Sequence, residues 1–385
     1  MKKWICYMLC ILGMLTFASC GKKAEPIDLP KADDVKSVMI TIEENTIEHT
    51  ENKWIRDLIA DLSEAKSTSK ESVQEVPQVA EYIQMDLKMQ EETMNLTLYE
   101  YEEKWYVEHP YVGIYEIDSS LYERLMKEYE EAFKIKMDSE GMTLESRFGV
   151  PNGFARCEKP EGSLAEFIAQ YPLKEAGSDV LLYDGRKKYN QNAHAAVFAL
   201  PIEDYDLQQC ADSIMRMYGE YYYKKGQYDK IRFHFSDGFL AEYDKWARGY
   251  RIKMDGDHAY WAKTSAPDSS YDSFVSFMRI VFSYAGTMSM EDEAEAISME
   301  ECRVGDVFLT GGSPGHVVMI VDLCENEKGE KAFLLAQGYM PAQEFHILKN
   351  PAHEDNPWYY ETEIEEELNT PEYHFSIEDL KRLEY

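Results

Sequence analysis

The stretch that decides the fold is "GDVFLTGGSPGHVVMIVD", residues 305–322. Its apolar residues form two runs, separated by the glycine- and proline-containing segment "GGSPG". This pattern predicts two core strands joined by a turn. His316 opens the second run, and a histidine in that place is either a hydrogen-bonded core residue or a functional one. The surroundings of His316 therefore decide which of these two roles it has.

The segments around this stretch predict one larger domain over residues 145–385. Helical spacing of apolar residues indicates helices over 204–226 and 270–287. Residues 331–348 read as further strands of the same sheet, and "NTPEYHFSIEDLKRLEY", residues 369–385, as a terminal strand and helix. Helices that alternate with hairpin-like strands are typical of an α+β domain.

A smaller domain is expected before it, over residues 35–135. Alternating apolar residues predict strands near 35–45, 80–89 and 93–102 and through 104–117, and helical spacing predicts helices over 51–65 and 119–133. We expect an antiparallel sheet with helices. Its sequence offers neither a nucleophile–base pair nor a metal-binding cluster.

The amino terminus has the layout of an export signal. "MKKWICYMLCILGMLTFASC" combines two lysines, a short apolar run and small residues before Cys20. Its "FASC" ending resembles the lipobox of bacterial lipoproteins, which implies a signal peptide over 1–19 and lipidation of Cys20. Residues 20–34 would then form a tether that holds the protein at the outer face of a cell membrane.

Composition excludes some classes of partner and cofactor. The formal charge of −32 argues against nucleic acid, because a phosphate-binding surface needs clustered lysine and arginine. No phosphate-binding loop follows a strand, so no nucleotide cofactor is indicated. The cysteines beyond the leader are Cys157, Cys210, Cys302 and Cys324, and their spacing does not suggest a metal site or a disulfide framework.

Two bacterial families of unknown function resemble this chain. The motifs "SVQEVP" and "YVEHPYVGIY" resemble the domain of unknown function family 5301. The motifs "VFSYAGT", "GDVFLTGGSPGHVVMIVD", "LLAQGYMPAQEFHILKNP" and "PWY" resemble family 4846, over nearly all of 145–385. Neither resemblance implies a reaction.

A more distant resemblance concerns NlpC-type peptidases, which are papain-like enzymes that cut peptide bonds in peptidoglycan. They share the order of a helix ending in "AG", a "GD" strand, and a histidine that opens the next strand. The resemblance implies a papain-like fold, His316 as general base and Gln337 as the residue that orients it. It would place the nucleophile near Ser273 or Phe274, where no cysteine stands.

Cys210 is the alternative nucleophile. It lies in the first turns of a predicted helix, where the backbone N–H groups favour a thiolate. Gln208 and Gln209 precede it, and either side chain could donate to an oxyanion. The other interpretation of Cys210 is a small apolar core residue, which its helical phase also fits.

Several roles stay open at this stage. Ser273 could replace the cysteine, and His194 could replace His316 as base or simply begin a strand. Tyr339 and Gln343 are expected to line a binding site.

We therefore carry two hypotheses. The first is a thiol hydrolase or amidase acting on cell-envelope peptides or peptidoglycan, with Cys210, His316 and Gln337 in its site. The second is a catalytically inactive envelope protein that binds a peptide or glycan. Neither hypothesis fixes the oligomeric state.

Overall fold

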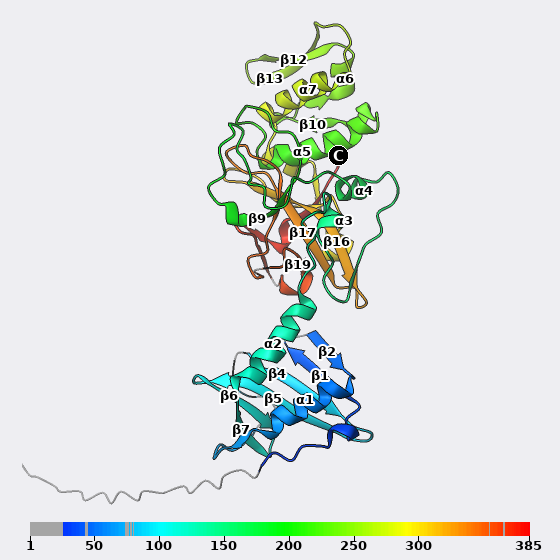
Figure 1. The fold of residues 1–385 in the computed structure, drawn as a ribbon. Coiled ribbons are helices and arrows are strands. Elements are labelled where there is room, and N and C mark those ends of the chain that lie inside the picture. Colours follow the sequence, from blue (N-terminus) through cyan, green and yellow to red (C-terminus); the bar gives the residue numbers. More distant parts are fainter. Residues whose placement is uncertain are drawn as a thin grey trace, which may run out of the picture. The chain divides into compact units, whose positions relative to one another are not determined.

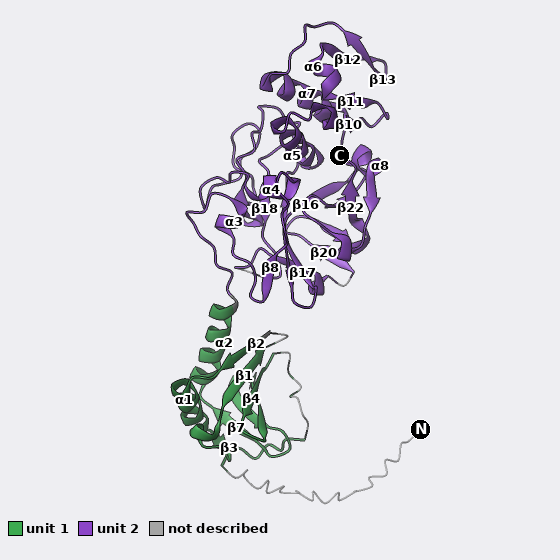
Figure 2. Cartoon of the chain, turned by 90° about the vertical axis from the view of Figure 1, so that its right-hand side faces the viewer, with its two compact units in different colours: residues 1–133 green, residues 134–385 purple. Residues whose placement is uncertain are grey.

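The computed structural model describes residues 26–42, 45–73, 77, 79, 81–353, 355–364 and 366–385. The predicted signal peptide and Cys20 lie outside the described residues. The chain divides into two compact units, residues 1–133 and 134–385 (Figure 2). Among the described residues, no helix has the length and apolar character needed to cross a membrane.

Unit 1 is a seven-stranded antiparallel sheet with two helices. The sheet order is β2-β1-β4-β5-β6-β7-β3. The elements are η1 (Ala32–Asp34), β1 (Ser37–Ile42), β2 (Asn45–His49), α1 (Asn52–Ser63), β3 (Lys66–Ser67), β4 (Ile83–Lys88), β5 (Thr93–Tyr101), β6 (Lys104–His109), β7 (Gly113–Ile117) and α2 (Ser119–Phe133).

Helical spacing explains how unit 1 closes its core. Ile55, Leu58 and Leu62 recur on one face of α1, so a single stripe is buried against the sheet. Leu121 and Leu125 of α2 join the same cluster. The two predicted helices are thus confirmed, while the run expected over 104–117 is divided into β6 and β7 by a turn.

Unit 2 is built on a nine-stranded antiparallel sheet (Figure 1). Its main order is β14-β22-β15-β16-β17-β18-β9, with β19 paired to β17 and β8 to β16. The strands of this sheet are β8 (Phe154–Arg156), β9 (His194–Val197), β14 (Ala294–Ala296), β15 (Val307–Thr310), β16 (His316–Asn326), β17 (Lys331–Gln337), β18 (His346–Leu348), β19 (Tyr359–Tyr360) and β22 (Leu380–Leu383).

The remaining elements of unit 2 are helices, hairpins and short 3-10 turns. The helices are α3 (Leu144–Arg147), α4 (Leu164–Ala169), α5 (Cys210–Lys224), α6 (Tyr243–Ala247), α7 (Tyr271–Tyr284) and α8 (Thr287–Asp292). The hairpins are β10 (Arg232–His234) with β11 (Leu240–Glu242), β12 (Tyr250–Asp255) with β13 (His258–Lys263), and β20 (Glu367–Asn369) with β21 (His374–Ser376). The 3-10 turns are η2 (Gln191–Ala193), η3 (Tyr228–Lys230), η4 (Met299–Glu301), η5 (Glu361–Glu363) and η6 (Ile377–Asp379).

Both faces of the central strands of unit 2 are covered. Val317 and Met319 of β16 belong to the cluster that contains α5 and α7, whereas Val318 and Ile320 belong to a second cluster with the β20–β21 hairpin. Successive side chains of a strand point to opposite faces, which is why β16 reads as an unbroken apolar run. The expected α+β class is confirmed for the mixture of helices with antiparallel sheets.

The carboxyl-terminal segment differs from expectation. In place of a terminal helix the structure has β20, β21, the turn η6 and then β22. Leu380 and Leu383 are the buried positions of β22, which pairs with both β15 and β14. Pairing with two strands satisfies the backbone of this segment, and tertiary context therefore overrides its weak helical pattern.

Candidate functional site

The centre of the candidate site is a hydrogen bond between two buried side chains on neighbouring strands. His316 opens β16 and Gln337 ends β17. His316 Nε2 lies 2.7 Å from Gln337 Oε1, and the two residues are 3% and 0% exposed. The predicted partnership of His316 with Gln337 is therefore present.

A carboxylate behind Gln337 fixes which way its amide points. Gln337 Nε2 donates to Glu372 Oε2 at 2.8 Å. Because a carboxylate only accepts, the amide nitrogen must face Glu372 and the amide oxygen must face His316. His316 Nε2 then carries the proton and donates it, which leaves the lone pair of the ring on Nδ1.

Lys188 and His346 complete this buried network. Lys188 Nζ forms an ion pair with Glu372 and lies 3.1 Å from His346 Nε2, which accepts its hydrogen bond. His346 Nδ1 donates to the backbone oxygen of Glu344 at 2.8 Å. Each of these groups has a partner, as buried polar groups require.

Burial sets the charge state of the imidazole rings. Burial lowers the pKa of His316 to about 4, although its hydrogen bond to Gln337 acts in the opposite direction. The pKa of His346 is also lowered, to well below its ordinary value, mainly by burial. Both rings are neutral at pH 7, so His316 can accept a proton.

Cys210 is the first residue of α5, and its thiol approaches the start of β16. The backbone N–H groups of Ala211, Cys210 and Val317 each act to lower the pKa of this thiol, so it lies near the start of β16. Val317 directly follows His316 and lies beyond the last β16–β17 pair, Met319 with Ala336. Cys210 therefore reaches the end of the sheet at which His316 stands.

The thiol and the imidazole approach this end from different sides. α5 packs on the Val317 face of the sheet, whereas His316 shares its face with Val318 and the β20–β21 hairpin. Among the described residues no hydrogen bond joins Cys210 to His316. Burial, followed by the charge of Asp212, raises the pKa of the Cys210 thiol to about 11.

Gly338 allows the amino terminus of α5 to sit against the end of β17. A Cβ at position 338 would lie 2.3 Å from Ser213 Oγ and 2.6 Å from the backbone oxygen of Gln209. Atoms cannot approach so closely, so only glycine permits this contact. The "AQGY" motif thus holds the amino terminus of α5 against the end of β17 that carries Gln337.

The residues that surround Cys210 hold the helix terminus in place. The Asp212 carboxylate accepts from the backbone N–H of Gln209 at 3.0 Å, and burial raises the pKa of Asp212 to about 8. Gln209 Nε2 donates to Asp206 at 3.2 Å, so this amide is occupied. Gln208 is 2% exposed, and neither atom of its amide has a partner among the described residues. Of the two predicted oxyanion donors, Gln208 is the one with unused hydrogen-bonding capacity.

Aromatic rings enclose His316. The ring centroids of Tyr339, Tyr373 and Phe375 lie 4.8, 5.0 and 5.9 Å from that of His316. Tyr339 comes two residues after Gln337 and is partly exposed, so it forms a rim of the site. Gln343 is placed differently from expectation: it is 1% exposed and its amide donates to the backbone of Pro341.

The alternative nucleophile and base are used structurally. Ser273 Oγ donates to the backbone of Asp268 and accepts from Trp246 Nε1, at 3.0 and 3.1 Å. Phe274 is fully buried against aromatic rings, including that of Tyr223 at 4.7 Å. His194 begins β9, at the edge of the sheet, and its Nε2 donates to the backbone oxygen of Ser178 at 3.0 Å. None of these contacts of Ser273 and Phe274 on α7 involves His316, whereas Cys210 on α5 lies near Val317, the next residue of β16.

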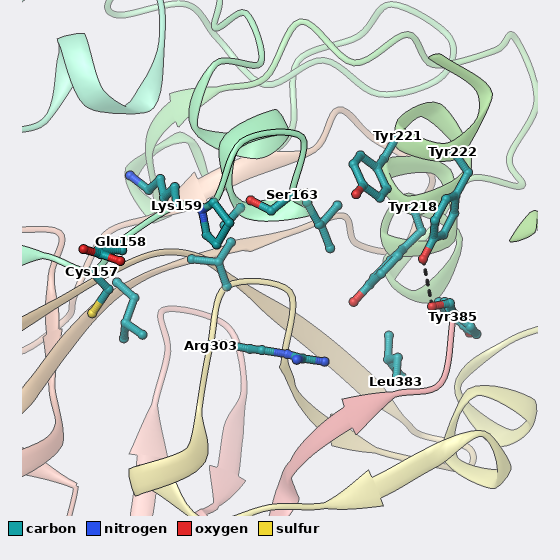
Figure 3. Close-up of a pocket in the computed structure, with 15 residues that line it drawn as sticks. Cys157, Glu158, Lys159, Ser163, Tyr218, Tyr221, Tyr222, Arg303, Leu383 and Tyr385 are labelled. Atoms are coloured by element: carbon teal, nitrogen blue, oxygen red, sulfur yellow. Dashed lines mark hydrogen bonds between the residues drawn. The ribbon is translucent and has the colours of Figure 1, made fainter. Parts of the chain in front are cut away.

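A separate cavity of about 460 Å³ lies elsewhere in unit 2 (Figure 3). Tyr218, Tyr221 and Tyr222 of α5 form one wall, with Arg303 and Cys157 on other sides. No histidine lines it, and burial raises the pKa of the Cys157 thiol. Because no histidine lines this cavity beside its cysteine, we do not take it as the candidate reaction site.

The other cysteines are also unreactive by their surroundings. Cys157, Cys302 and Cys324 are free thiols in the part of the chain that the structure describes. Burial raises the pKa of Cys302 to about 12 and that of Cys324 further. Within the described ranges, no three His, Cys, Asp or Glu side chains are arranged to hold a metal ion.

Sequence reasoning did not find Glu372 or Lys188. Glu372 lies in the turn "TPEY" between β20 and β21, and Lys188 in the loop before η2. Loop charges are ordinarily solvated, so nothing in their local pattern signals burial. Only the long-range folding of both loops over β17 brings them together.

The fold and the site define a two-unit α+β protein in which a helix-terminal cysteine approaches a buried His–Gln–Glu network. The family model described as Domain of unknown function (4846) matches residues 144–382, and the chain belongs to this family. A second model, DUF5301, described as Domain of unknown function (DUF5300), matches residues 23–116. Both predicted family resemblances are thereby confirmed, whereas the resemblance to NlpC-type peptidases stays a prediction.

The other comparisons add little. The search of curated proteins found no match. A solved structure described as "NMR structure of the protein from Ruminococcus gnavus" is 30% identical; the match covers 24% of this chain and 90% of that chain, with a TM-score of 0.22.

Proposed function

We propose that unit 2 is a thiol hydrolase or amidase of papain-like design that acts on peptides of the cell envelope. The observation that carries the proposal is that three chain segments end at the same end of one sheet, with the thiol and the ring on different faces: Cys210 at the start of α5, His316 at the start of β16 and Gln337 at the end of β17. The lipoprotein-like leader supports an extracytoplasmic protein, held at the membrane through Cys20.

The proposed chemistry follows from the placement of the protons. His316 Nδ1 takes the proton of the Cys210 thiol while the sulfur attacks the amide carbonyl and a carbon–sulfur bond forms. The imidazolium then gives this proton to the departing amine as the carbon–nitrogen bond breaks. Water, deprotonated by His316, hydrolyses the thioester and restores the thiol.

Gln337 and the helix terminus assist different parts of this reaction. Gln337 Oε1 holds the proton on Nε2 and accepts a stronger hydrogen bond once the ring becomes charged. The backbone N–H of Cys210 and the amide of Gln208 are the candidate donors to the oxyanion of the tetrahedral intermediate.

The electrostatics imply a neutral resting pair. With the thiol pKa near 11 and the imidazole pKa near 4, Cys210 and His316 are both uncharged at pH 7. The proton must therefore move during attack. Activity should be retained through neutral pH and lost as the pH falls through about 4, when the ring is protonated.

The raised thiol pKa supports a second candidate function. A buried, protonated Cys210 and neutral His316 also suit a protein that binds an envelope peptide or glycan without cutting it. The aromatic wall made by Tyr339 and Tyr373 would then supply contacts to the ligand.

The experiment is amine release from purified peptidoglycan fragments and envelope peptides by the full mature chain. We expect Cys210→Ala to lower turnover on the order of 10³-fold or more while the fragments still bind. Cys157→Ala, at another free cysteine of unit 2, is the matched control and should retain turnover. Turnover that survives Cys210→Ala would contradict the hydrolase assignment, whereas binding without turnover by the wild-type protein would favour the second candidate.

A further inference from the structure

We propose that Glu372 is a positioning residue of this site, which fixes the orientation of the Gln337 amide and through it the tautomer of His316. The inference rests on the proposed function for its catalytic meaning. The predicted hydrogen bonds and the tautomer of His316 can be tested in a protein that shows no enzymatic activity.

An amide side chain has no preferred orientation of its own. Its oxygen and nitrogen are nearly equal in size, so Gln337 could present either group to His316. Turned around, it would donate Nε2–H to His316 Nε2. The ring would then carry its proton on Nδ1, and no lone pair would remain for the Cys210 thiol.

Glu372 removes this ambiguity because it can only accept. Its Oε2 receives Gln337 Nε2 at 2.8 Å, and the turned amide would place two oxygens against each other there. The second acceptor near the same nitrogen, His346 Nε2, lies at 3.4 Å, at the long end of hydrogen-bond range. Glu372 is therefore the stronger of the two constraints.

The carboxylate is itself held from two sides. Lys188 forms the ion pair with Glu372, and the side chains of the two residues are 5% and 13% exposed. Asn190 Nδ2 approaches Glu372 Oε1 at 3.4 Å. The ion pair with Lys188 compensates the burial of this carboxylate, and a carboxylate group offers Gln337 only acceptor atoms.

Hydrogen bonds between its first and last residues close the turn that carries Glu372. Thr370 Oγ1 donates to the backbone oxygen of Tyr373 at 2.7 Å and accepts from its N–H at 3.1 Å. Tyr373 and Phe375 from the same hairpin pack on the His316 ring. The β20–β21 hairpin thus supplies both the wall behind His316 and the carboxylate that orders its partner.

The test is ¹⁵N nuclear magnetic resonance of the histidine rings in the full mature chain, with His316 assigned through a His316→Gln variant. In the wild-type protein we expect the Nε2–H tautomer of His316. In Glu372→Gln the new side chain can both donate and accept, so Gln337 can turn. We expect a mixture containing the Nδ1–H tautomer, together with a fall in kcat of about 10–100-fold at nearly constant KM.

The matched control is Glu344→Gln. Glu344 is also a buried carboxylate paired with a lysine, Lys174 at 2.5 Å, but it makes no contact with Gln337. The His316 tautomer should stay unchanged in this variant. If Glu372→Gln does not fold because Lys188 is left unpaired, the double variant Lys188→Met/Glu372→Gln removes both charges and is measured instead.

The outcomes separate this inference from the proposed function. A folded Glu372→Gln or double variant that keeps the wild-type tautomer overturns the positioning role, even if the enzyme is active. A change of tautomer in a protein without turnover supports the positioning role while the hydrolase assignment fails.

Discussion

The sheets of the two units handle buried polar side chains in different ways. The sheet of unit 1 buries few of them: Glu108 of β6, 2% exposed, accepts from Ser72 Oγ at 2.6 Å and lies opposite Thr97 of β5. The sheet of unit 2 buries a connected set, because His316, Gln337 and His346 stand on the adjacent strands β16, β17 and β18.

The buried carboxylate of unit 1 has a local hydrogen-bond partner, whereas the buried polar side chains of unit 2 are hydrogen-bonded to one another across several strands and loops. A single buried carboxylate needs one or two donors to offset its desolvation. The network of unit 2 recruits Lys188 and Glu372 from distant loops and fixes the proton position of one ring. Such an arrangement costs stability unless every member is satisfied, so its presence points to a function of unit 2 rather than of unit 1.

The largest expected effect comes from replacing a polar side chain of the unit 2 network by an apolar one. Gln337→Leu buries more apolar surface in unit 2, yet it leaves His316 Nε2–H and Glu372 short of a partner. We expect a loss of about 2–5 kcal/mol in unfolding free energy and of about 10²-fold or more in turnover.

The control is the reverse substitution, leucine to glutamine, in the core of unit 1. Leu98 is fully buried on β5, and Leu98→Gln places an amide there without a prepared partner. It should destabilise unit 1 by a similar amount and leave turnover unchanged. Hydrogen exchange resolved by unit measures both variants, and a neutral Gln337→Leu would show that the network is dispensable.

Acid should destabilise unit 2 more than unit 1. The pKa of His316 is about 4 when folded and 6.5 when unfolded, so the unfolded chain binds the proton first. Stability therefore falls as the pH drops from about 6.5 to 4, by about 3 kcal/mol from this residue. His346 acts in the same direction. In unit 1 the pKa values of His49 and His109 are also lowered by burial, but both residues are partly exposed.

Denaturant unfolding followed by hydrogen exchange at pH 7 and pH 4.5 measures this difference. In His316→Gln the loss on acidification should shrink. Equal acid sensitivity of the two units would show that the buried rings of unit 2 are not the cause.

The smallest effect is expected at the contact between α5 and β17. Gly338→Ala would push Ser213 and Gln209 away and should cost about 1–3 kcal/mol, because the site is already filled. The displaced helix terminus should also change the alkylation rate of Cys210. Gly286→Ala is the matched control, since a Cβ at 286 meets nothing within 4 Å. If the two variants show the same unfolding free energy and the same alkylation rate of Cys210, Gly338 is not needed for the contact between α5 and β17.

Much of this molecule can be predicted from local pattern. The alternation in β4 and β5 and the helical stripe of α1 follow from periodicity alone, and His316 was singled out by its place at the start of an apolar run. What pattern could not reveal is which helix packs at the end of the sheet where that histidine stands. The order of segments favoured α7, whereas packing through Gly338 selects α5.

The same limit applies to the terminal segment and to the second half of the network. β22 forms because its backbone pairs with both β14 and β15. A prediction from helical spacing considers only the residues of the segment itself and cannot include this pairing. Glu372 and Lys188 are separated by 184 positions, and only the folded chain brings them into an ion pair beside Gln337 and His346.

The most direct test of the central claim is a crystal structure of the mature chain that gives the distance between Cys210 Sγ and His316 Nδ1. The account predicts a separation of about 3–4 Å with Nδ1 turned toward the sulfur and Gln337 Oε1 behind Nε2. The thiol and the ring approach from different faces here, so the prediction requires the thiol to come within this range; a separation beyond hydrogen-bond reach, with Nδ1 directed away from the sulfur, would contradict the hydrolase and leave a binding protein.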